Sequence, residues 1–460
     1  MNKEHCLNCA RLQAELEEKG RRITQLEGEK VLLAYDLKQL RDKWFSRRKK
    51  KLGEETGEIK QEPKKRGAPK GHAGWFRKKP DRVDIEEEVT LERCPQCGSR
   101  ELTECCDTEE HIQEDIILPR LEVRKYLHRF YWCKTCKEVV SGIGKEEIPR
   151  SYIGPKAKAV AAYLKYTVKV SQRDIQKIFA YLCGLKVTAS SIPGFNNQVR
   201  RKALPLYEEL KTELKKAAYV HADETGAPVD GDNYWDWVFA TTRICLHVID
   251  KSRGQKVVEA VLGKRYGGIL VSDFLGAYNK LEAKAKQKCL VHLLRDLKKI
   301  LECTGEDDPH HVYCRQLKNL LQQAIDLSGL YGGKEISKQK FEVKRRLIKE
   351  TLGDFQFPDP QKSVLTRISK RLARHKDELF TFLDYPGIPY HNNHAERLIR
   401  PSVLLRKITF GNRSLNGVLN HDVLMSLQQT ARLNDKNPIR MLNSILTHQK
   451  KLPLSFCLGP

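Results

Sequence analysis

Three acidic residues that lie far apart in the sequence constrain the fold of this chain more than any other feature. Asp223 and Asp273 each follow a short apolar run that is typical of a buried strand, and Glu396 lies in the segment 392–397 at the start of a predicted helix. Side chains at two strand ends and at a helix start can meet if these elements pack together. We therefore expect the three carboxylates to converge, and converging carboxylates are typical ligands of metal ions.

The hydrophobic pattern around the first two acids predicts an α/β fold. The predicted strands are 217–222, 234–241, 244–249 and 268–272. Polar turns separate the first three, which indicates an antiparallel meander, and a helix is predicted over 255–262 before the fourth. This order is typical of an α/β nuclease fold, in which the ends of the first and fourth strands lie side by side.

Paired metal ions would explain why carboxylates stand at these positions. Two divalent ions about 3.5 to 4 Å apart can activate an oxygen nucleophile and stabilise the departing oxygen of a phosphodiester. Magnesium, or manganese in its place, prefers oxygen ligands, so aspartate and glutamate suit it where histidine or cysteine would select another metal. Glu224 and Asp250 compete for this role, but we expect Glu224 to point to the opposite face of its strand and Asp250 to be paired in a turn.

Each acid also has a purely structural interpretation. Asp223 could end its strand with a side-chain turn, and Asp273 could cap the following helix. Asn393 and Glu396 have the spacing of a capping box, in which the glutamate bonds back to the cap residue. The metal hypothesis therefore depends on the three acids taken together.

The charge of the chain favours a polyanionic partner. Its 460 residues contain 84 Lys and Arg against 59 Asp and Glu, a formal net charge of +25. No run of eighteen apolar residues and no secretory signal are present, so we expect a soluble, intracellular protein. In a reducing compartment, closely spaced cysteines are better interpreted as metal ligands or core residues than as disulfides.

The N-terminal region divides into a heptad segment and a basic segment. Leucines at 12, 26, 33 and 40 repeat in steps of seven, which predicts a coiled coil over 1–42 that joins at least two chains, although a single amphipathic helix is the alternative. Cys6 and Cys9 precede it, but one isolated pair is a weak metal signal. Residues 43–82 are rich in Lys, Arg, Gly and Pro and predict a flexible linker, which either follows DNA phosphates or is a solvated tether.

Two Cys-x-x-Cys pairs predict a zinc ribbon over residues 83–150. Cys94 and Cys97 form one pair and Cys133 and Cys136 the other, and each pair can hold one tetrahedral ion by two thiolates. The segment 122–132 between them alternates as a ribbon strand requires. The alternative is four free thiols, and contact of the ribbon with DNA stays open.

Residues 151–215 predict a helical region. The segment 170–182 has amphipathic spacing and opens at Ser171, Gly184 interrupts it, and a second helix starts near 188–192. This outline resembles a helix-turn-helix, whose second helix enters a DNA major groove, but an ordinary helical hairpin has the same pattern.

Four motifs together resemble those of the insertion-sequence-66 transposase family. They are His221-x-Asp223-Glu224-Thr225, Ser272-Asp273 followed by Tyr278, Cys289-x-x-His292-x-x-Arg295, and Asn392-Asn393-x-Ala395-Glu396-Arg397-x-x-Arg400-Pro401. The N-terminal helix, the basic linker, the zinc ribbon and the closing Asn437-Pro438 segment are also similar to the layout of that family, so the resemblance covers nearly the whole chain.

The resemblance implies a DNA transposase with a ribonuclease-H-like core. The catalytic Asp-Asp-Glu triad would be Asp223, Asp273 and Glu396, which would use magnesium to hydrolyse transposon ends and join the freed 3′-hydroxyl to target DNA. The core would comprise 216–300 and 386–448, with a helical insertion at 301–385. The sequence agrees independently, because 317–327 and 341–352 carry helical apolar spacing.

The resemblance also implies DNA contacts and partners. Arg397 and Arg400, beside the third acid, are candidate phosphate ligands, together with Asn393, His292 and Arg295. For His292 and Arg295, which share one helical face with Cys289, the alternative is a hydrogen bond inside the core. Where the family often has a second arginine after Arg295, this chain has Asp296, which would place negative charge near DNA. The implied partners are the terminal inverted repeats, target DNA, further copies of the chain and small accessory proteins, in the cytoplasm of a bacterium at the nucleoid. The alternatives are an inactive transposase that regulates through DNA binding and a nuclease of the same fold.

Overall fold

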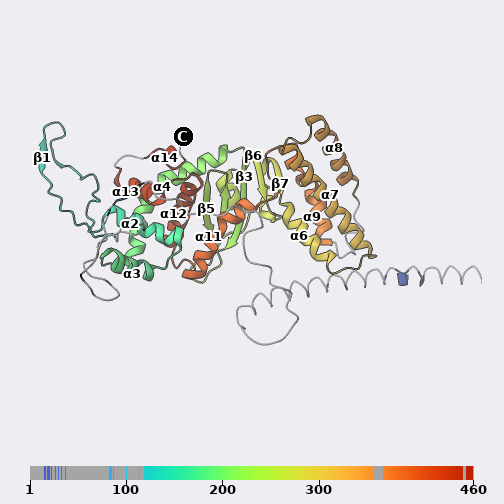
Figure 1. Ribbon diagram of the computed structural model, residues 1–460, viewed down its shortest axis with the longest axis horizontal. Helices are drawn as coiled ribbons and strands as arrows, with labels where there is room; N and C mark the ends of the chain where they lie inside the picture. The colour runs from blue at the N-terminus through green and yellow to red at the C-terminus, as the bar shows by residue number, and fades with distance from the viewer. Residues whose placement is uncertain are drawn as a thin grey trace, which may run out of the picture. The chain divides into compact units, whose positions relative to one another are not determined.

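The computed structural model describes residues 119–355, 366–448 and 452–458, with scattered positions between 15 and 113 (Figure 1). The chain separates into a large unit, residues 1–46 and 121–460, and a smaller unit, residues 47–120. Most of the basic linker and of the first half of the predicted ribbon, with Cys94 and Cys97, lies outside the described residues. The described positions of 1–42 are helical with exposed leucines at 16, 26, 33 and 37, and the coiled coil stays a prediction.

A mixed five-stranded sheet forms the centre of the large unit. Its strands are β3 (Tyr219–Gly226), β4 (Trp235–Ala240), β5 (Cys245–Asp250), β6 (Arg265–Ser272) and β7 (Glu282–Lys288), in the order β5-β4-β3-β6-β7. Strands β3, β4 and β5 are antiparallel neighbours, whereas β6 pairs in parallel with both β3 and β7. The predicted meander and the side-by-side position of the first and fourth strands are therefore confirmed, as is the predicted helix, α5 (Gln255–Leu262).

The first strand differs from the prediction because it continues past its acid. Asp223 was expected to end the strand, but β3 runs on to Gly226 while pairing with β4. Its parallel pairing with β6 stops at His221, opposite Val271. Asp223 therefore lies inside β3 at the level where β6 ends, and this is the position from which it can face Asp273.

Alternation along the strands gives the sheet two different faces. Val220, Trp237 and Phe239 point to one face and pack with α5 and with α4 (Ser191–Lys216) in the main hydrophobic core. The other face carries His221 and Asp223, together with the β4 residues opposite them. It lies beneath α11 (Asn393–Thr409) and α12 (Leu415–Leu433) (Figure 1). The candidate acids thus share a face with the helix that carries Glu396.

Helix α12 protects the outer edge of the sheet at β5. The backbone N–H groups of Cys245, His247 and Ile249 donate to the side chains of Thr430 (3.1 Å), Ser426 (2.7 Å) and Asp422 (2.9 Å), respectively. The acceptors are four residues apart on α12, which advances about 6 Å over that length, and the donors are two residues apart on β5, which advances about 6.8 Å. The two spacings are nearly equal, so three successive bonds can form. The helix therefore satisfies edge groups that would otherwise remain unpaired.

Helices precede the sheet as predicted. They are α2 (Pro155–Tyr163), the π-helix η1 (Leu164–Val168), α3 (Gln172–Cys183) and α4. The hydroxyl of Ser171 caps α3 by accepting from the Asp174 N–H, and Gly184 ends it with φ +67°, which glycine adopts without strain. Apolar side chains of α3 and of the start of α4 share a small core, while the rest of α4 packs into the main core.

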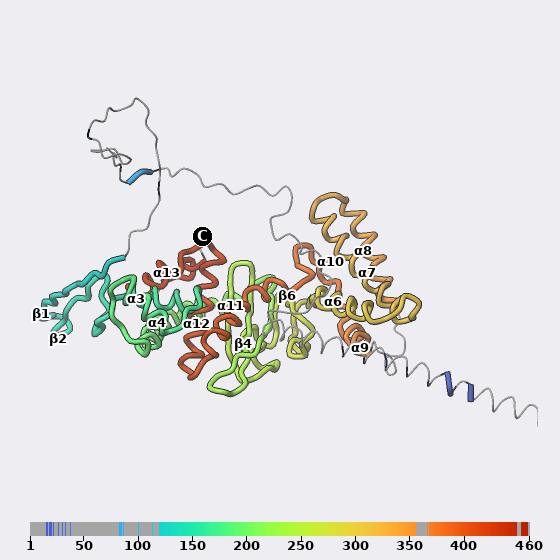
Figure 2. Tube along the Cα trace, turned by 60° about the horizontal axis from the view of Figure 1, so that its bottom comes forward, coloured from blue at the N-terminus to red at the C-terminus, as the bar shows by residue number. Residues whose placement is uncertain are grey.

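A helical region between β7 and α11, which contains the residues of the predicted insertion, has its own hydrophobic core. Its helices are α6 (Leu290–Leu301), α7 (Pro309–Gly332), α8 (Lys338–Asp354), α9 (Thr366–His375), the 3₁₀ helix η3 (Lys376–Glu378) and α10 (Thr381–Asp384) (Figure 2). This core begins already with α6, whose Leu290, Leu293 and Leu297 are buried in it. Both segments with predicted helical spacing lie in α7 and α8.

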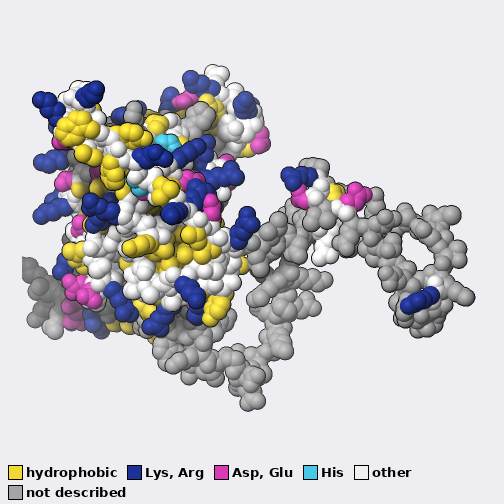
Figure 3. Space-filling view, turned by 90° about the vertical axis from the view of Figure 1, so that its left-hand side faces the viewer, with side chains coloured by type: hydrophobic (Ala, Val, Ile, Leu, Met, Phe, Trp, Pro, Cys, Tyr) yellow, Lys and Arg dark blue, Asp and Glu magenta, His cyan; other side chains and the backbone are white. Residues whose placement is uncertain are grey.

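The remaining described elements are short. They are the hairpin strands β1 (Phe130–Cys133) and β2 (Glu138–Ser141), the turn η2 (Gly276–Tyr278), α13 (Pro438–Thr447) and α14 (Ser455–Leu458). Lys and Arg side chains are spread over the face drawn in Figure 3, as the net charge leads one to expect. Within the described residues, no helix combines the length and the apolar character that crossing a membrane requires.

Candidate active site

The three predicted acids reach one region from three different elements. Asp223 projects from β3, Asp273 directly follows β6, and Glu396 lies in the first turn of α11, which packs on β3 and β4. Asp273 is held at the strand end because its Oδ1 accepts from the Leu275 N–H at 2.9 Å. The parallel pairing of β3 with β6 brings the first two acids together, and α11 adds the third.

The electrostatics of Asp223 support this grouping. Its pKa is raised to about 8, first by burial and then by the negative charges of Glu224, Asp273 and Glu396. Among the ion pairs of the described residues, none involves Asp223 or Asp273. Asp223 is therefore repelled by the neighbouring acids without an ion pair of its own, an arrangement that a bound cation would relieve.

Glu396 does not act as a helix cap. The N-cap of α11 is Asn392 and not Asn393, and its side chain makes no capping bond. The Oε1 atom of Glu396 is buried without a hydrogen-bond partner, and His292 Nε2 lies 3.8 Å from it. The capping-box interpretation is therefore wrong, and Glu396 is left with a free ligand atom.

Asn392 positions the third acid, a role that the sequence interpretation did not assign. Its buried side chain donates from Nδ2 to the Ala222 carbonyl at 2.8 Å and accepts at Oδ1 from His221 Nδ1 at 3.0 Å. Its backbone N–H donates to Cys289 Sγ at 3.2 Å. One residue thus ties the start of α11 to β3 and to the start of α6. The paired asparagines of the motif were the available signal.

Neighbouring side chains hold the site from the opposite face of the sheet. Glu224 accepts from Arg253 at 2.9 Å and from the Tyr278 hydroxyl at 3.1 Å, so it is a paired acid on that face, as expected. Buried Lys288 donates to the Ser272 hydroxyl at 3.2 Å and to the Asp273 carbonyl at 3.0 Å. These bonds fix the backbone on which the second acid stands.

Asp250 is bonded within its turn, where its Oδ1 accepts from the Ser252 N–H at 2.6 Å. Its neighbours in the sequence, Lys251 and Arg253, pair instead with Asp232 and Glu224. Asp250 is therefore exposed and separate from the three acids.

The candidate DNA ligands lie on α6 and α11. Arg295, Arg397 and Arg400 are exposed, and none pairs with an acid among the described residues. Asn393 is half-buried, and His292 faces Glu396. The negative charge of Asp296 is compensated, because its carboxylate accepts from Arg371 of α9 at 2.6 Å. Asp296 therefore does not leave an unbalanced negative charge next to Arg295.

Two groups of three described side chains have potential metal-ligand atoms within 4.8 Å of one another. They are Asp236, His247 and His421, and Cys289, His292 and Glu396. Neither group contains Asp223 or Asp273, so the three acids do not form a tight single-ion cage.

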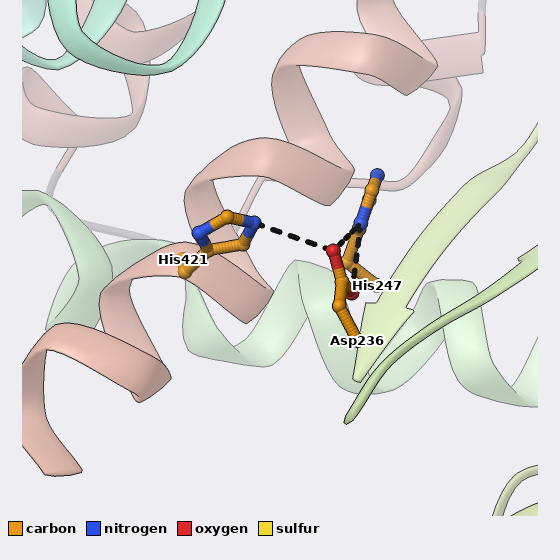
Figure 4. A group of neighbouring side chains, drawn as sticks. All are labelled: Asp236, His247 and His421. Atoms are coloured by element: carbon orange, nitrogen blue, oxygen red, sulfur yellow. Dashed lines mark hydrogen bonds and ion pairs between the residues drawn. The ribbon is translucent and has the colours of Figure 1, made fainter. Parts of the chain in front are cut away.

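The first group is a closed hydrogen-bond network between the sheet and α12 (Figure 4). His247 Nδ1 donates to both oxygens of Asp236 at 3.2 Å, and its Nε2 lies 3.0 Å from the side-chain amide of Gln429. His421 Nε2 lies 3.0 Å from the Ser402 hydroxyl and 3.7 Å from Asp236. Since these atoms are buried and already have partners, we interpret the network as a structural connection between the sheet and α12.

Half of the predicted zinc site is described. Cys133 ends β1, and Cys136 lies in the turn before β2. Hydrogen bonds from the backbone and thiol of Cys136 lower the pKa of the Cys133 thiol. The two sulfur atoms are therefore neighbours in an exposed turn whose N–H groups favour a thiolate.

Comparison with known proteins identifies the class. The family described as "Transposase IS66 family" matches residues 150–419. Uncharacterized protein y4jD of Sinorhizobium fredii (strain NBRC 101917 / NGR234) is 22% identical over 414 residues, which are 81% of this chain and 78% of that protein. Uncharacterized protein y4hP of the same strain is 20% identical over 416 residues, 82% and 73% of the two chains.

These similarities place the chain among transposases, a class of DNA-acting enzymes that generally use divalent metal ions. Because the matched region covers more than half of the sequence, the chain belongs to the IS66 transposase family.

Proposed function

We propose that this protein cleaves the ends of a transposon and joins the resulting 3′-hydroxyl to target DNA, with Asp223, Asp273 and Glu396 as the catalytic acids. The observation that carries the proposal is the grouping of the three acids around a buried Asp223, whose pKa is raised first by burial and then by the neighbouring acids, without a compensating ion pair. The strand order β5-β4-β3-β6-β7 with two parallel strands beside an antiparallel meander supports a ribonuclease-H-like core.

The donor set fits magnesium. Asp223, Asp273 and Glu396 offer only oxygen atoms, one of which is buried without a partner, and their mutual repulsion favours a cation between them. When bound, a pair of such ions activates the attacking oxygen and stabilises the leaving oxygen. The protein supplies the orientation, because Asn392 fixes α11 on β3 and Lys288 fixes the end of β6.

Exposed arginines would hold the DNA strand beside the acids. Arg397 and Arg400 follow Glu396 within about one turn of α11, and Arg295 projects from α6. Each guanidinium can bind a phosphate in a bidentate manner without coordinating metal. Asn393 at the start of α11 and His292 near the start of α6 would add polar contacts to the same strand. Helix α3 with the start of α4 would contact the terminal repeat.

The function is tested with DNA that carries the inverted repeats flanking the gene. We expect the full chain to cut this DNA at the repeat ends only with Mg²⁺ or Mn²⁺ present and to release a 3′-hydroxyl. Equal cutting of random DNA would favour a general nuclease of the same fold. Specific binding without any cutting would favour the inactive regulator.

Magnesium should stabilise the protein more at alkaline than at acidic pH. The pKa of Asp223 is about 8 in the folded chain and near 4 in ordinary carboxyls, so the metal-free fold loses stability as pH rises from about 4 to about 8. A cation that replaces the proton removes this loss. We expect the increase in Tm on adding Mg²⁺ to be larger at pH 9 than at pH 6, and to shrink in Asp223→Asn. An increase independent of pH would contradict the grouping.

The cysteine pair at the β1–β2 turn supports a structural zinc site. We propose that Cys133 and Cys136 complete a four-thiolate site with Cys94 and Cys97, and we expect one equivalent of zinc per chain to survive dialysis. Cys133→Ser should lose it, whereas Cys303→Ser, at a partly buried cysteine after α6, should keep it. Less than about half an equivalent in the unaltered chain would contradict the site.

We also propose that the active form contains at least two chains, joined through residues 1–42 and acting at the bacterial nucleoid, with small accessory proteins of the same element as possible helpers. The exposed leucines at 16, 26, 33 and 37 support a partner helix. Removal of residues 1–42 should then lower the sedimentation coefficient to that of a single chain.

A further inference from the structure

Three chemically different ligand atoms meet at the starts of α6 and α11. They belong to Cys289, the N-cap of α6, to His292 one turn later, and to Glu396 in the first turn of α11. Sulfur, nitrogen and oxygen atoms from these residues lie within 4.8 Å of one another. Cys289 and His292 occupy one side of the helix start because they are three positions apart.

The surroundings of Cys289 suit a metal-bound sulfur. Its Sγ is buried and accepts the Asn392 N–H at 3.2 Å, and the N–H groups of Val291 and His292 at the start of α6 also favour its charged form. Burial raises the pKa of the thiol, while these three donors act in the opposite direction. N–H donors around a sulfur are the outer-shell contacts that stabilise a thiolate ligand and orient it toward a metal.

The other two ligands contain polar atoms without partners. His292 Nδ1 and Glu396 Oε1 are both buried and lack a hydrogen bond, whereas His292 Nε2 lies 3.8 Å from Glu396 Oε1. Buried polar atoms are normally bonded, so two orphans in one small cluster call for a missing partner. In the buried network of Asp236, by contrast, both ring nitrogens of His247 and the Nε2 atom of His421 have partners.

We propose that Cys289, His292 and Glu396 bind one thiophilic divalent cation, represented by Zn²⁺, and that this ion withdraws Glu396 from the acidic site. Sulfur and imidazole ligands select zinc over magnesium, and three protein ligands leave a fourth tetrahedral position for water. The binding site depends only on the geometry of these three residues, whereas the withdrawal of Glu396 from the acidic site rests on the proposed function. Zinc would then inhibit the magnesium-dependent reaction by competing for the third acid.

Binding is measured by adding Co²⁺ to the dialysed, zinc-loaded full chain. We expect one further equivalent to bind and to produce the near-ultraviolet sulfur-to-cobalt charge-transfer band. Cys289→Ser should abolish this band, and His292→Asn, at a partly exposed residue, should weaken Co²⁺ binding by at least about tenfold. Cys303→Ser is the matched control and should bind as the unaltered chain does. A band that persists in Cys289→Ser with unchanged stoichiometry would overturn the site.

Inhibition is measured separately, as cleavage at fixed Mg²⁺ with increasing free Zn²⁺. The concentration for half-inhibition should rise at least about tenfold in Cys289→Ser relative to Cys303→Ser. An equal concentration in both variants would overturn the competition while leaving the binding site standing. Absence of cleavage in the unaltered chain would instead count against the proposed function, and the cobalt titration would still decide the metal site.

Discussion

Asp223→Asn, Asp273→Asn and Glu396→Gln should each lower the rate of end cleavage by at least about a thousandfold, on the order of 4 kcal/mol of transition-state stabilisation. Each substitution keeps the shape of the side chain but removes a charged oxygen ligand. The acids reach the site from β3, the end of β6 and α11, and the neighbouring acid Glu224 is already bonded to Arg253 and Tyr278. The rate is measured on DNA with the inverted repeats under single-turnover conditions.

Two controls separate chemistry from folding and binding in this experiment. Asp250→Asn alters an exposed acid outside the group and should leave cleavage within about twofold of the unaltered rate. DNA binding should persist in all variants, because the phosphate contacts that we propose come from the arginines and not from the acids. Since burial and neighbouring acids raise the pKa of Asp223, Asp223→Asn should not destabilise the metal-free fold at alkaline pH. Full cleavage by any of the three variants would remove that residue from the site.

Asp236→Ala should lower the free energy of unfolding by about 3 to 5 kcal/mol, the range found when one partner of a buried ion pair is removed. Asp236 and His247 are fully buried, and both oxygens of the carboxylate lie 3.2 Å from the imidazole Nδ1 (Figure 4). The alanine variant would leave the Nδ1–H without an acceptor and open a gap between β4 and α12. Chemical unfolding followed by near-ultraviolet circular dichroism measures the change.

An exposed ion pair provides the comparison. Lys251 and Asp232 are 3.2 Å apart but both side chains are largely solvent-exposed, so Lys251→Ala should change stability by less than about 1 kcal/mol. Equal effects of Asp236→Ala and Lys251→Ala would mean that the buried network contributes nothing beyond a surface pair. Activity loss without a change in unfolding would instead place Asp236 in the catalytic site.

The sequence predicted the elements whose burial leaves a clear pattern. The runs at β4, β5 and β6 are apolar because both faces of the central sheet are covered, and α5 was predicted with its observed bounds. Ser171 and Gly184 marked the ends of α3, because each residue forms a hydrogen bond with a backbone group at one end of the helix. The positions of the three acids followed from these elements and from the family motifs.

The features that were missed depend on tertiary contacts. Strand β7 has the sequence EAKAKQK, which carries no large apolar side chain and forms the edge of the sheet. The length of β3 beyond Asp223 is set by its pairing with β4 and not by local hydrophobicity. Likewise, Asn392 and Cys289 were visible only as motif letters, since their bonds join segments more than a hundred residues apart.

The bonds between α12 and β5 have a consequence for biosynthesis. The strand leaves the ribosome well before the helix, because 173 to 185 positions separate the bonded residues. Until the helix arrives, the strand presents three open N–H groups and resembles an unfinished sheet, to which another nascent chain can add. Translation that stops before Leu415 should therefore yield insoluble product, whereas the completed polypeptide covers the exposed strand with its own helix.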